Sequence, residues 1–213
     1  MGTYLKGILG SFSGKVGTVI GSSWNGIAYM RSIGRPSSAA PTAAQLLQRA
    51  KFALVMAFVS PIQAIFTTGF KSASVGQTGV NAATSYILSK AVLGLTPATV
   101  ELDYPKILFS KGPLAGTNGL AESALGRVDL SWENNSGSAN ASATDKLVML
   151  VYCEEFKQYV YEVTPVVRSA GDYSLIVPAN FIGFAVEVWF AFQTADGKTM
   201  STSLHAGQVI VEA

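Results

Sequence analysis

The glycine-rich stretch near the start of the chain holds the pattern that comes closest to a chemical motif. Gly10, Gly14 and Lys15 are ordered as in a phosphate-binding loop, where backbone amides and a lysine hold phosphate oxygens. That motif needs four residues between its glycines, and this chain has three. It also needs Ser or Thr after the lysine to hold magnesium, and Val16 stands there. We therefore expect a glycine-rich turn or arm.

The other reactive side chains do not combine into a catalytic set. His205 is the only histidine and Cys153 the only cysteine, which excludes a histidine metal cluster, a cysteine zinc site and an internal disulfide. A serine–histidine–aspartate triad through His205 stays open, but no nucleophile-elbow motif accompanies it. Glu154 and Glu155 would point to opposite faces of a strand, so a solvated turn is the better interpretation. We expect no enzyme, no cofactor and no metal, and a core position for Cys153.

The composition indicates that another molecule covers much of the protein surface. Hydrophobic residues make up 49% of the chain and charged residues 13%, whereas about 25% is typical of soluble domains. A membrane, copies of the same chain or other partners could cover such a surface. The longest apolar run, 52–66, is shorter than the roughly 20 residues of a membrane-spanning helix, so we expect a buried helix and no membrane partner. The first residues are not a secretory signal, so we expect synthesis in the cytoplasm. The final location stays open, with a released particle or filament as one alternative.

Charge is divided unevenly along the chain. Residues 1–100 contain eight basic and no acidic side chains, whereas residues 101–213 contain seven basic and thirteen acidic ones. The halves therefore carry +8 and −6. A basic half on one copy could meet an acidic half on the next, and such head-to-tail contacts generate rings or filaments. The basic residues form no run and no recognition motif, so we do not expect nucleic acid as a partner.

The first 36 residues are interrupted by regularly spaced glycines. Their spacing would form a stripe on a helix, but glycine costs about 1 kcal/mol per position there, and residues 16–20 favour a strand. Asn25-Gly26 suits a two-residue hairpin turn, so we predict a β-hairpin over about 15–33 after a flexible arm; plain loops are the alternative. If the glycines instead let another chain lie close, the candidate assembly contacts are Gly7, Gly10, Gly14, Gly17, Gly21, Trp24, Arg31 and Arg35.

Two helices are expected next. Thr42 and Gln45 have the spacing of a capping box at a helix start. The helix that follows is apolar on almost every side in its middle, which predicts burial all round. Pro61 should kink or restart it, and Gly69 is a suitable end. A second helix is predicted over about 81–94.

From about residue 105 the pattern changes to short alternating runs separated by turn residues. Such runs lie at 107–109, 127–132, 146–152, 159–163, 173–177, 185–192, 200–203 and 209–211. Seven or eight strands over about 110 residues are typical of a β-sandwich. In the run 185–192, alternation places Glu187 and Trp189 outward. The side chains that it places inward are Val186, Val188, Phe190 and Phe192. Asp196-Gly197 predicts a hairpin turn.

The sandwich half resembles a fibronectin type III module. The resemblance rests on Leu130-Ser131-Trp132-Glu133 and on Val188-Trp189-Phe190-Ala191-Phe192, followed by Asp196-Gly197 and Thr199–Ser203. It covers about half of the chain. It implies an immunoglobulin-like fold with a core tryptophan on an early strand, and it implies no activity, because this architecture carries many functions.

The N-terminal half is similar to an uncharacterised Bacteroidota family, a domain of unknown function that spans the full length of such chains. The similarity rests on Gly7-Ile8-Leu9-Gly10, Ser13-Gly14-Lys15-Val16-Gly17, Trp24-Asn25-Gly26, Arg31, Pro41-Thr42-Ala43-Ala44-Gln45, Arg49 and Phe52. The resemblance implies no activity and no site residues.

Together these patterns predict an α+β protein. A basic arm, hairpin and helical region occupies residues 1–100, and an immunoglobulin-like β-sandwich occupies 101–213. The expected function is that of a non-enzymatic self-assembling structural protein, a subunit of a filament, tube or phage-like particle, with itself as partner. The alternative is a glycan- or protein-binding module displayed by a larger assembly, which would use the loops around 134–144.

Overall fold

The computed structural model describes residues 2–4, 10–24, 26–35, 38–74 and 76–212. It divides into two compact units, Met1–Thr42 and Ala43–Ala213. This division differs from the predicted one between residues 100 and 101. The helices belong with the sandwich because they share a core with one of its sheets.

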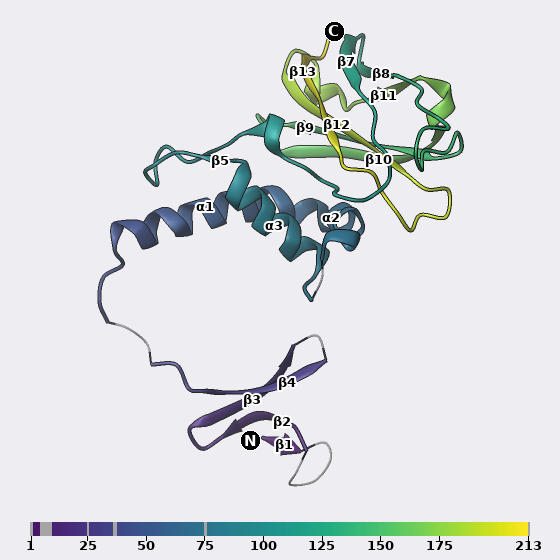
Figure 1. Ribbon diagram of the computed structural model, residues 1–213. Coiled ribbons are helices and arrows are strands. Elements are labelled where there is room, and N and C mark those ends of the chain that lie inside the picture. Colours follow the sequence, from purple (N-terminus) through teal and green to yellow (C-terminus); the bar gives the residue numbers. More distant parts are fainter. Residues whose placement is uncertain (1, 5–9, 25, 36–37, 75, 213) are drawn as a thin grey trace. The chain divides into compact units, whose positions relative to one another are not determined.

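The first unit is a four-stranded antiparallel sheet in the order β1-β2-β3-β4 (Figure 1). Its strands are β1 (Thr3–Tyr4), β2 (Phe12–Val16), β3 (Val19–Trp24) and β4 (Ile27–Ser32). The hairpin predicted over 15–33 therefore corresponds to β3, β4 and the end of β2. Gly17 and Gly26, with φ of 58° and 83°, lie in the two tight turns, where a positive φ is required. Asn25 lies outside the described residues.

The second unit begins with helices. They are α1 (Ala43–Val59), α2 (Gln63–Gly69) and α3 (Gly79–Lys90), with short 3-10 turns at Ser60–Ile62 and Lys71–Ala73. The predicted boundaries of the first helical segment are confirmed. α1 begins directly after Thr42, a 3-10 turn containing Pro61 separates α1 from α2, and α2 ends at Gly69.

The third helix is displaced from its predicted range of 81–94. Its cap is Thr78, whose hydroxyl accepts a hydrogen bond from the backbone N–H of Asn81 at 3.2 Å. It ends at Lys90, because the chain then pairs β5 (Val92–Leu93) with β6 (Glu101–Leu102).

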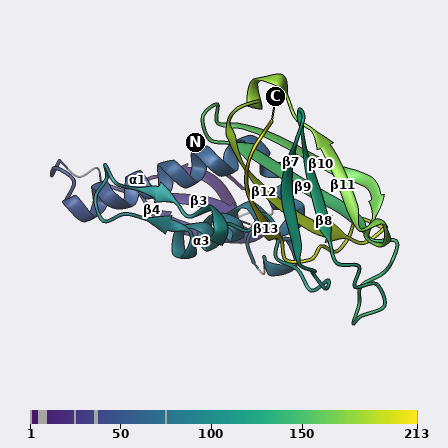
Figure 2. The same cartoon turned by 90° about the horizontal axis from the view of Figure 1, so that it is seen from above.

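The rest of the unit is the predicted immunoglobulin-like sandwich. Its strands are β7 (Gly119–Ala124), β8 (Arg127–Trp132), β9 (Lys146–Cys153), β10 (Gln158–Val167), β11 (Asp172–Ile176), β12 (Ala185–Gln193) and β13 (Leu204–Ile210), with 3-10 turns at Tyr104–Lys106, Arg168–Ala170 and Ala179–Phe181. Figure 2 shows the three-stranded sheet β11-β8-β7 stacked on the four-stranded sheet β10-β9-β12-β13. The α+β class is therefore confirmed.

Most predicted strands are confirmed, and two are not. The runs at 127–132, 146–152, 159–163, 173–177 and 185–192 are β8 to β12, and 209–211 overlaps the end of β13. Residues 107–109 form no strand, and Met200 and Ser201 form isolated bridges only. Ile107, Phe109 and Met200 are buried, so the apolar pattern there reflects burial rather than strand pairing. The predicted turn is confirmed, since the N–H of Gly197 donates to the carbonyl of Thr194 at 2.8 Å.

A first core fills the space between the two sheets. The side chains of Val128, Leu130 and Trp132 point inward from β8, as predicted, and all three are buried. The ring of Trp132 meets that of Phe192 on β12 edge to face, with centroids 5.7 Å apart. This is the core tryptophan that the fibronectin type III resemblance implies.

A second core lies on the other face of the four-stranded sheet, which the helices cover (Figure 1). The ring of Phe58 on α1 packs against Tyr152 of β9, Tyr159 of β10 and Trp189 of β12. Glu187 and Trp189 do point away from the first core, but they are not exposed: 6% and 1% of their surfaces are accessible. The predicted outward direction is therefore confirmed, and both side chains are buried because the helices form a third layer on this face. This shared core joins residues 43–100 to the sandwich.

The segment Ala43–Gly69 is long and apolar enough to cross a membrane by length and composition. In the structure, 39% of its apolar window is buried within the protein. The buried apolar side chains are Val55, Phe58, Val59, Ile62, Ile65 and Phe66. Packing on the sheet thus accounts for the apolar character of the second half of the segment. The predicted burial on all sides is wrong, because α1 packs with one side only and Phe52 is 49% exposed.

Candidate assembly surfaces

The N-terminal sheet buries almost none of its own side chains. Among the described residues of the first unit, Gly21 alone is buried, and the buried apolar side chains of the described chain all lie at Val55 or later. A small sheet is stable in water when one of its faces packs against another layer. This sheet therefore needs a cover from another surface.

One side of the sheet carries no charge. The residues on this uncharged face are Phe12, Gly14, Val16, Val19, Gly21, Ser23, Ala28, Met30 and Ser32, as the register of β2, β3 and β4 places them. Met30 is 71% exposed. Gly14 and Gly21 lie directly opposite each other. A Cβ on Gly21 would meet the backbone oxygen and the ring of Phe12, so this position requires glycine.

The other side of the sheet combines basic and aromatic residues. The members of this basic face are Lys15, Ile20, Ser22, Trp24, Ile27, Tyr29 and Arg31. Lys15, Ile20 and Arg31 form one row across three strands. Trp24, Ile27 and Tyr29 are 52%, 70% and 44% exposed. Aromatic side chains and arginine are the residues enriched in protein interfaces.

The structure distributes the predicted contact residues over this unit. Gly14 and Gly21 are on the uncharged face, and Trp24 and Arg31 are on the basic face. Gly17 lies in a turn, Gly10 precedes β2, and Arg35 follows β4 as an exposed residue. Gly7 lies outside the described residues. Lys15, Tyr29 and Met30 are exposed on these faces but were not among the predicted contact residues, although the alternation over 27–32 was a signal for the last two.

The phosphate-loop pattern at the start of the chain forms no loop. Gly14 and Lys15 lie within β2, paired with Gly21 and Ile20 of β3. An extended, paired strand cannot wrap its amides around a phosphate. The interpretation as a glycine-rich turn is thereby corrected to a glycine-containing strand.

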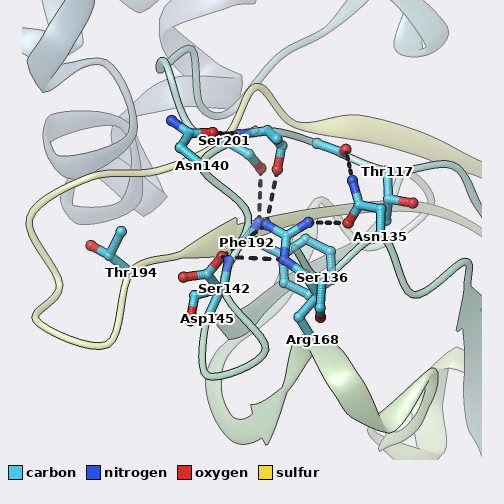
Figure 3. A network of polar contacts seen from close by, with 12 residues as sticks. Thr117, Asn135, Ser136, Asn140, Ser142, Asp145, Arg168, Phe192, Thr194 and Ser201 are labelled. Atoms are coloured by element: carbon cyan, nitrogen blue, oxygen red, sulfur yellow. Dashed lines mark hydrogen bonds and ion pairs between the residues drawn. The ribbon is translucent and has the colours of Figure 1, made fainter. Parts of the chain in front are cut away.

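The sandwich contains a buried ionic network, drawn in Figure 3. Arg168 is fully buried, and its Nε and Nη2 lie 3.2 and 3.1 Å from Oδ2 of Asp145. Its Nη1 donates to Oδ1 of Asn135 at 2.6 Å, and its guanidinium lies 4.0 Å from the ring centre of Phe192. Burial lowers the pKa of Arg168, and the charge of Asp145 opposes that shift. The network fastens the loop before β9 to the core.

The asparagines of the predicted binding loop are also engaged within the protein. Asn135 donates to the carbonyl of Gly116 at 2.7 Å. Asn140 accepts from the N–H of Ala115 at 2.8 Å and donates to the carbonyl of Pro113 at 2.9 Å. These amides hold the loop in place and are not free to recognise a glycan.

His205 lies beside a carboxylate. Its Nε2 is 2.6 Å from Oε2 of Glu187, and Gln208 donates to Oε1 of the same carboxylate at 2.8 Å. Among the described residues, the side-chain hydrogen bonds of His205 and Glu187 join them to each other and to Gln208, and none reaches a serine, threonine or cysteine. Cys153 is buried, as predicted, and Glu154 and Glu155 lie in an exposed turn after β9. The described residues contain no group of three metal-ligating side chains.

A cluster of tyrosines joins α1 to the sandwich. The rings of Tyr152 and Tyr159 stack with centroids 4.6 Å apart, and Tyr104 contacts Tyr152. Burial is the main reason that the pKa values of Tyr104 and Tyr159 are raised far above the ordinary value. The cluster borders a pocket of about 320 Å³.

The fold and the exposed sheet together define a fibronectin type III-like protein with an additional helical layer and an N-terminal sheet. The chain belongs to a family of unknown function (DUF6266), whose model matches residues 11–207. No curated protein matches it. Among solved structures it is similar to the FN1–FN3 domains of chicken CNTN1, at 10% identity and a TM-score of 0.37. That match covers 48% of this chain and 35% of the other, so the chain spans about a third of that protein's resolved length.

Proposed function

We propose that this protein is a non-enzymatic structural subunit that assembles with copies of itself into a filament, tube or phage-like particle. The observation that carries the proposal is the N-terminal sheet, which exposes apolar side chains on both faces and has no core of its own. In the assembly, another copy of the chain buries these exposed apolar side chains. A Bacteroidota source for the family, suggested by the sequence motifs, is part of the same proposal.

The opposite charges of the two units favour a second copy of the chain as the partner that covers the N-terminal sheet. The first unit has four basic and no acidic residues, whereas the second has eleven basic and thirteen acidic ones. A contact between the first unit of one copy and the second unit of the next is heterologous. Such a contact leaves one unpaired first unit and one unpaired second unit at the ends of the assembly. Its repetition closes a ring or extends a filament.

Sedimentation velocity of the full-length protein tests the proposal. At about 50 mM salt we expect species that grow as the protein concentration rises from micromolar to hundreds of micromolar. At 1 M salt, where the Debye length is about 3 Å, they should become smaller. A monodisperse monomer at every concentration in low salt would contradict the proposal.

A pair of variants locates the contact within the molecule. Ile27→Glu places a carboxylate on the basic face, where the side chain is 70% exposed, and should abolish assembly. Leu95→Glu is the matched control, because Leu95 is an 89% exposed apolar residue of the second unit. It should leave assembly unchanged. The opposite pattern would place the contact on the second unit alone.

The alternative, a glycan- or protein-binding module, gains no specific support, since the loop asparagines are engaged in internal hydrogen bonds.

A further inference from the structure

The sandwich has a sheet face that no other layer of its unit covers. The four-stranded sheet packs on helices on one side and on β8 on the other. The three-stranded sheet β11-β8-β7 packs with its inner side only. On its outer side, Leu120 and Ile176 are 57% and 79% exposed. Among the described residues this side of the sheet therefore has apolar side chains that are open to a partner.

This outer surface is acidic. The side chains of the acidic face, as the strand register places them, are Leu120, Glu122, Arg127, Asp129, Ser131, Asp172, Ser174 and Ile176. Glu122 and Asp129 lie directly opposite each other, an arrangement that is destabilising for like charges. Arg127 is the one cation of the face, and its Nε lies 3.2 Å from Oδ1 of Asp129. Three carboxylates and one guanidinium leave an excess of negative charge.

The acidic face is hollowed between its carboxylates. A hollow of about 350 Å³ is lined by residues that include Glu122, Asp129 and Asp172. An arginine or lysine side chain entering it would neutralise the opposed pair, and arginine can bind a carboxylate through two parallel hydrogen bonds.

The basic face of the N-terminal sheet has matching dimensions. Lys15 and Arg31 lie two strands apart on β2 and β4, and Glu122 and Asp172 lie two strands apart on β7 and β11. Lys15 and Arg31 share one row and lie about 10 Å apart, because neighbouring strands are about 4.8 Å apart. Glu122 and Asp172 are offset by two residues along their strands and lie about 12 Å apart. Exposed apolar residues accompany the charges on both surfaces: Trp24 and Ile27 on one, Leu120 and Ile176 on the other.

We propose that the basic face of the N-terminal sheet docks on the acidic face of the sandwich in a second copy of the chain. Lys15 and Arg31 then pair with Glu122, Asp129 and Asp172, and the apolar residues of both faces pack around the charges. This inference rests on the proposed self-assembly and specifies its two surfaces. The uncharged face stays available for a further layer.

Charge reversal in the full-length protein tests the contact. Arg31→Glu and Asp172→Lys should each weaken association at low salt at least tenfold. Both side chains are exposed, so circular dichroism should show an unchanged fold. Lys90→Glu and Glu155→Lys are matched controls, because they make the same charge changes at exposed positions outside both faces. These controls should associate like the wild type.

Mixing the two reversed variants gives the decisive result. In the mixture, the new carboxylate at position 31 of one variant meets the new ammonium group at position 172 of the other, while the remaining contact has wild-type residues on both sides. We expect assembly to return in the mixture with alternating copies. If the wild type assembles and the single variants assemble equally well, the docking surfaces are wrong and the proposed function stands. If the wild type itself is monomeric, the proposed function fails. Compaction of the monomer that depends on these residues but not on concentration would also overturn the docking between copies.

Discussion

The hydroxyl of Tyr159 on β10 donates a hydrogen bond to the backbone carbonyl of Phe58 on α1, at 2.8 Å. This bond crosses the boundary that the sequence predicted at residue 100, within a core that both sides share. The helices and the sandwich should therefore unfold together. Variants that retain Trp132 or Trp189 as the single tryptophan of this unit report on the two cores separately. We expect their urea transitions to coincide, and two separate midpoints would contradict the shared core.

The same hydrogen bond should contribute measurably to stability. Tyr159→Phe removes one buried donor and leaves the carbonyl of Phe58 without it, which should lower the free energy of unfolding by about 1 kcal/mol. Tyr161→Phe on the same strand is the control, because Tyr161 is 44% exposed. Equal effects of the two substitutions in urea denaturation would argue against a specific role of the bond.

The buried ion pair should be costly to break from one side. Asp145→Asn leaves the guanidinium of Arg168 buried without its counter-charge, and we expect a loss of about 3–5 kcal/mol in the free energy of unfolding. Asp196→Asn is the control, since the ion pair of Asp196 with Lys198 is exposed and should matter little. A small effect at Asp145 would show that the loop relaxes and hydrates the guanidinium.

Alkaline pH should destabilise the protein through its buried tyrosines. Burial raises the pKa of Tyr104 and Tyr159 in the folded state, whereas tyrosines in the unfolded chain ionise near pH 10. Their contribution to the free energy of unfolding is thus fully present below about pH 10. It is lost as pH rises further, because these tyrosines ionise in the unfolded chain and not in the folded one. Thermal unfolding between pH 8 and 11 should show a falling Tm, and Tyr104→Phe should flatten the fall. A Tm independent of pH would contradict this account.

The glycine on the uncharged face should be needed for the sheet. Gly21→Ala introduces a Cβ that meets the backbone of Phe12, so β2 and β3 cannot keep their register and assembly should fail. Gly34→Ala is the control, because a Cβ there has open space around it. Light scattering at low salt compares the two, and normal assembly of Gly21→Ala would show that the sheet tolerates the shift.

Local patterns predicted the strands well where one face meets a core. Alternation placed Val128, Leu130 and Trp132 inward because β8 is buried on one face only. The same rule placed Glu187 on the opposite face of β12 correctly, but it did not show that this face is buried. The carboxylate of Glu187 is buried and bonded to His205 and Gln208. No local pattern reveals that a helix will cover a sheet, since this depends on contacts distant in sequence.

The N-terminal sheet was partly predictable from local sequence. Glycine spacing and Asn25-Gly26 indicated a hairpin and several candidate contact residues. The pairing of Lys15 with Ile20, and of Ile20 with Arg31, depends on the register of three strands. A shift by one residue would have moved every side chain to the opposite face.

Electron microscopy of the negatively stained full-length protein tests the central claim most directly. At low salt and high concentration we expect filaments, tubes or rings of repeating subunits, and for Ile27→Glu in the same buffer dispersed single particles. Dispersed single particles for the wild-type protein under these conditions would contradict the claim that the N-terminal sheet joins copies of the chain.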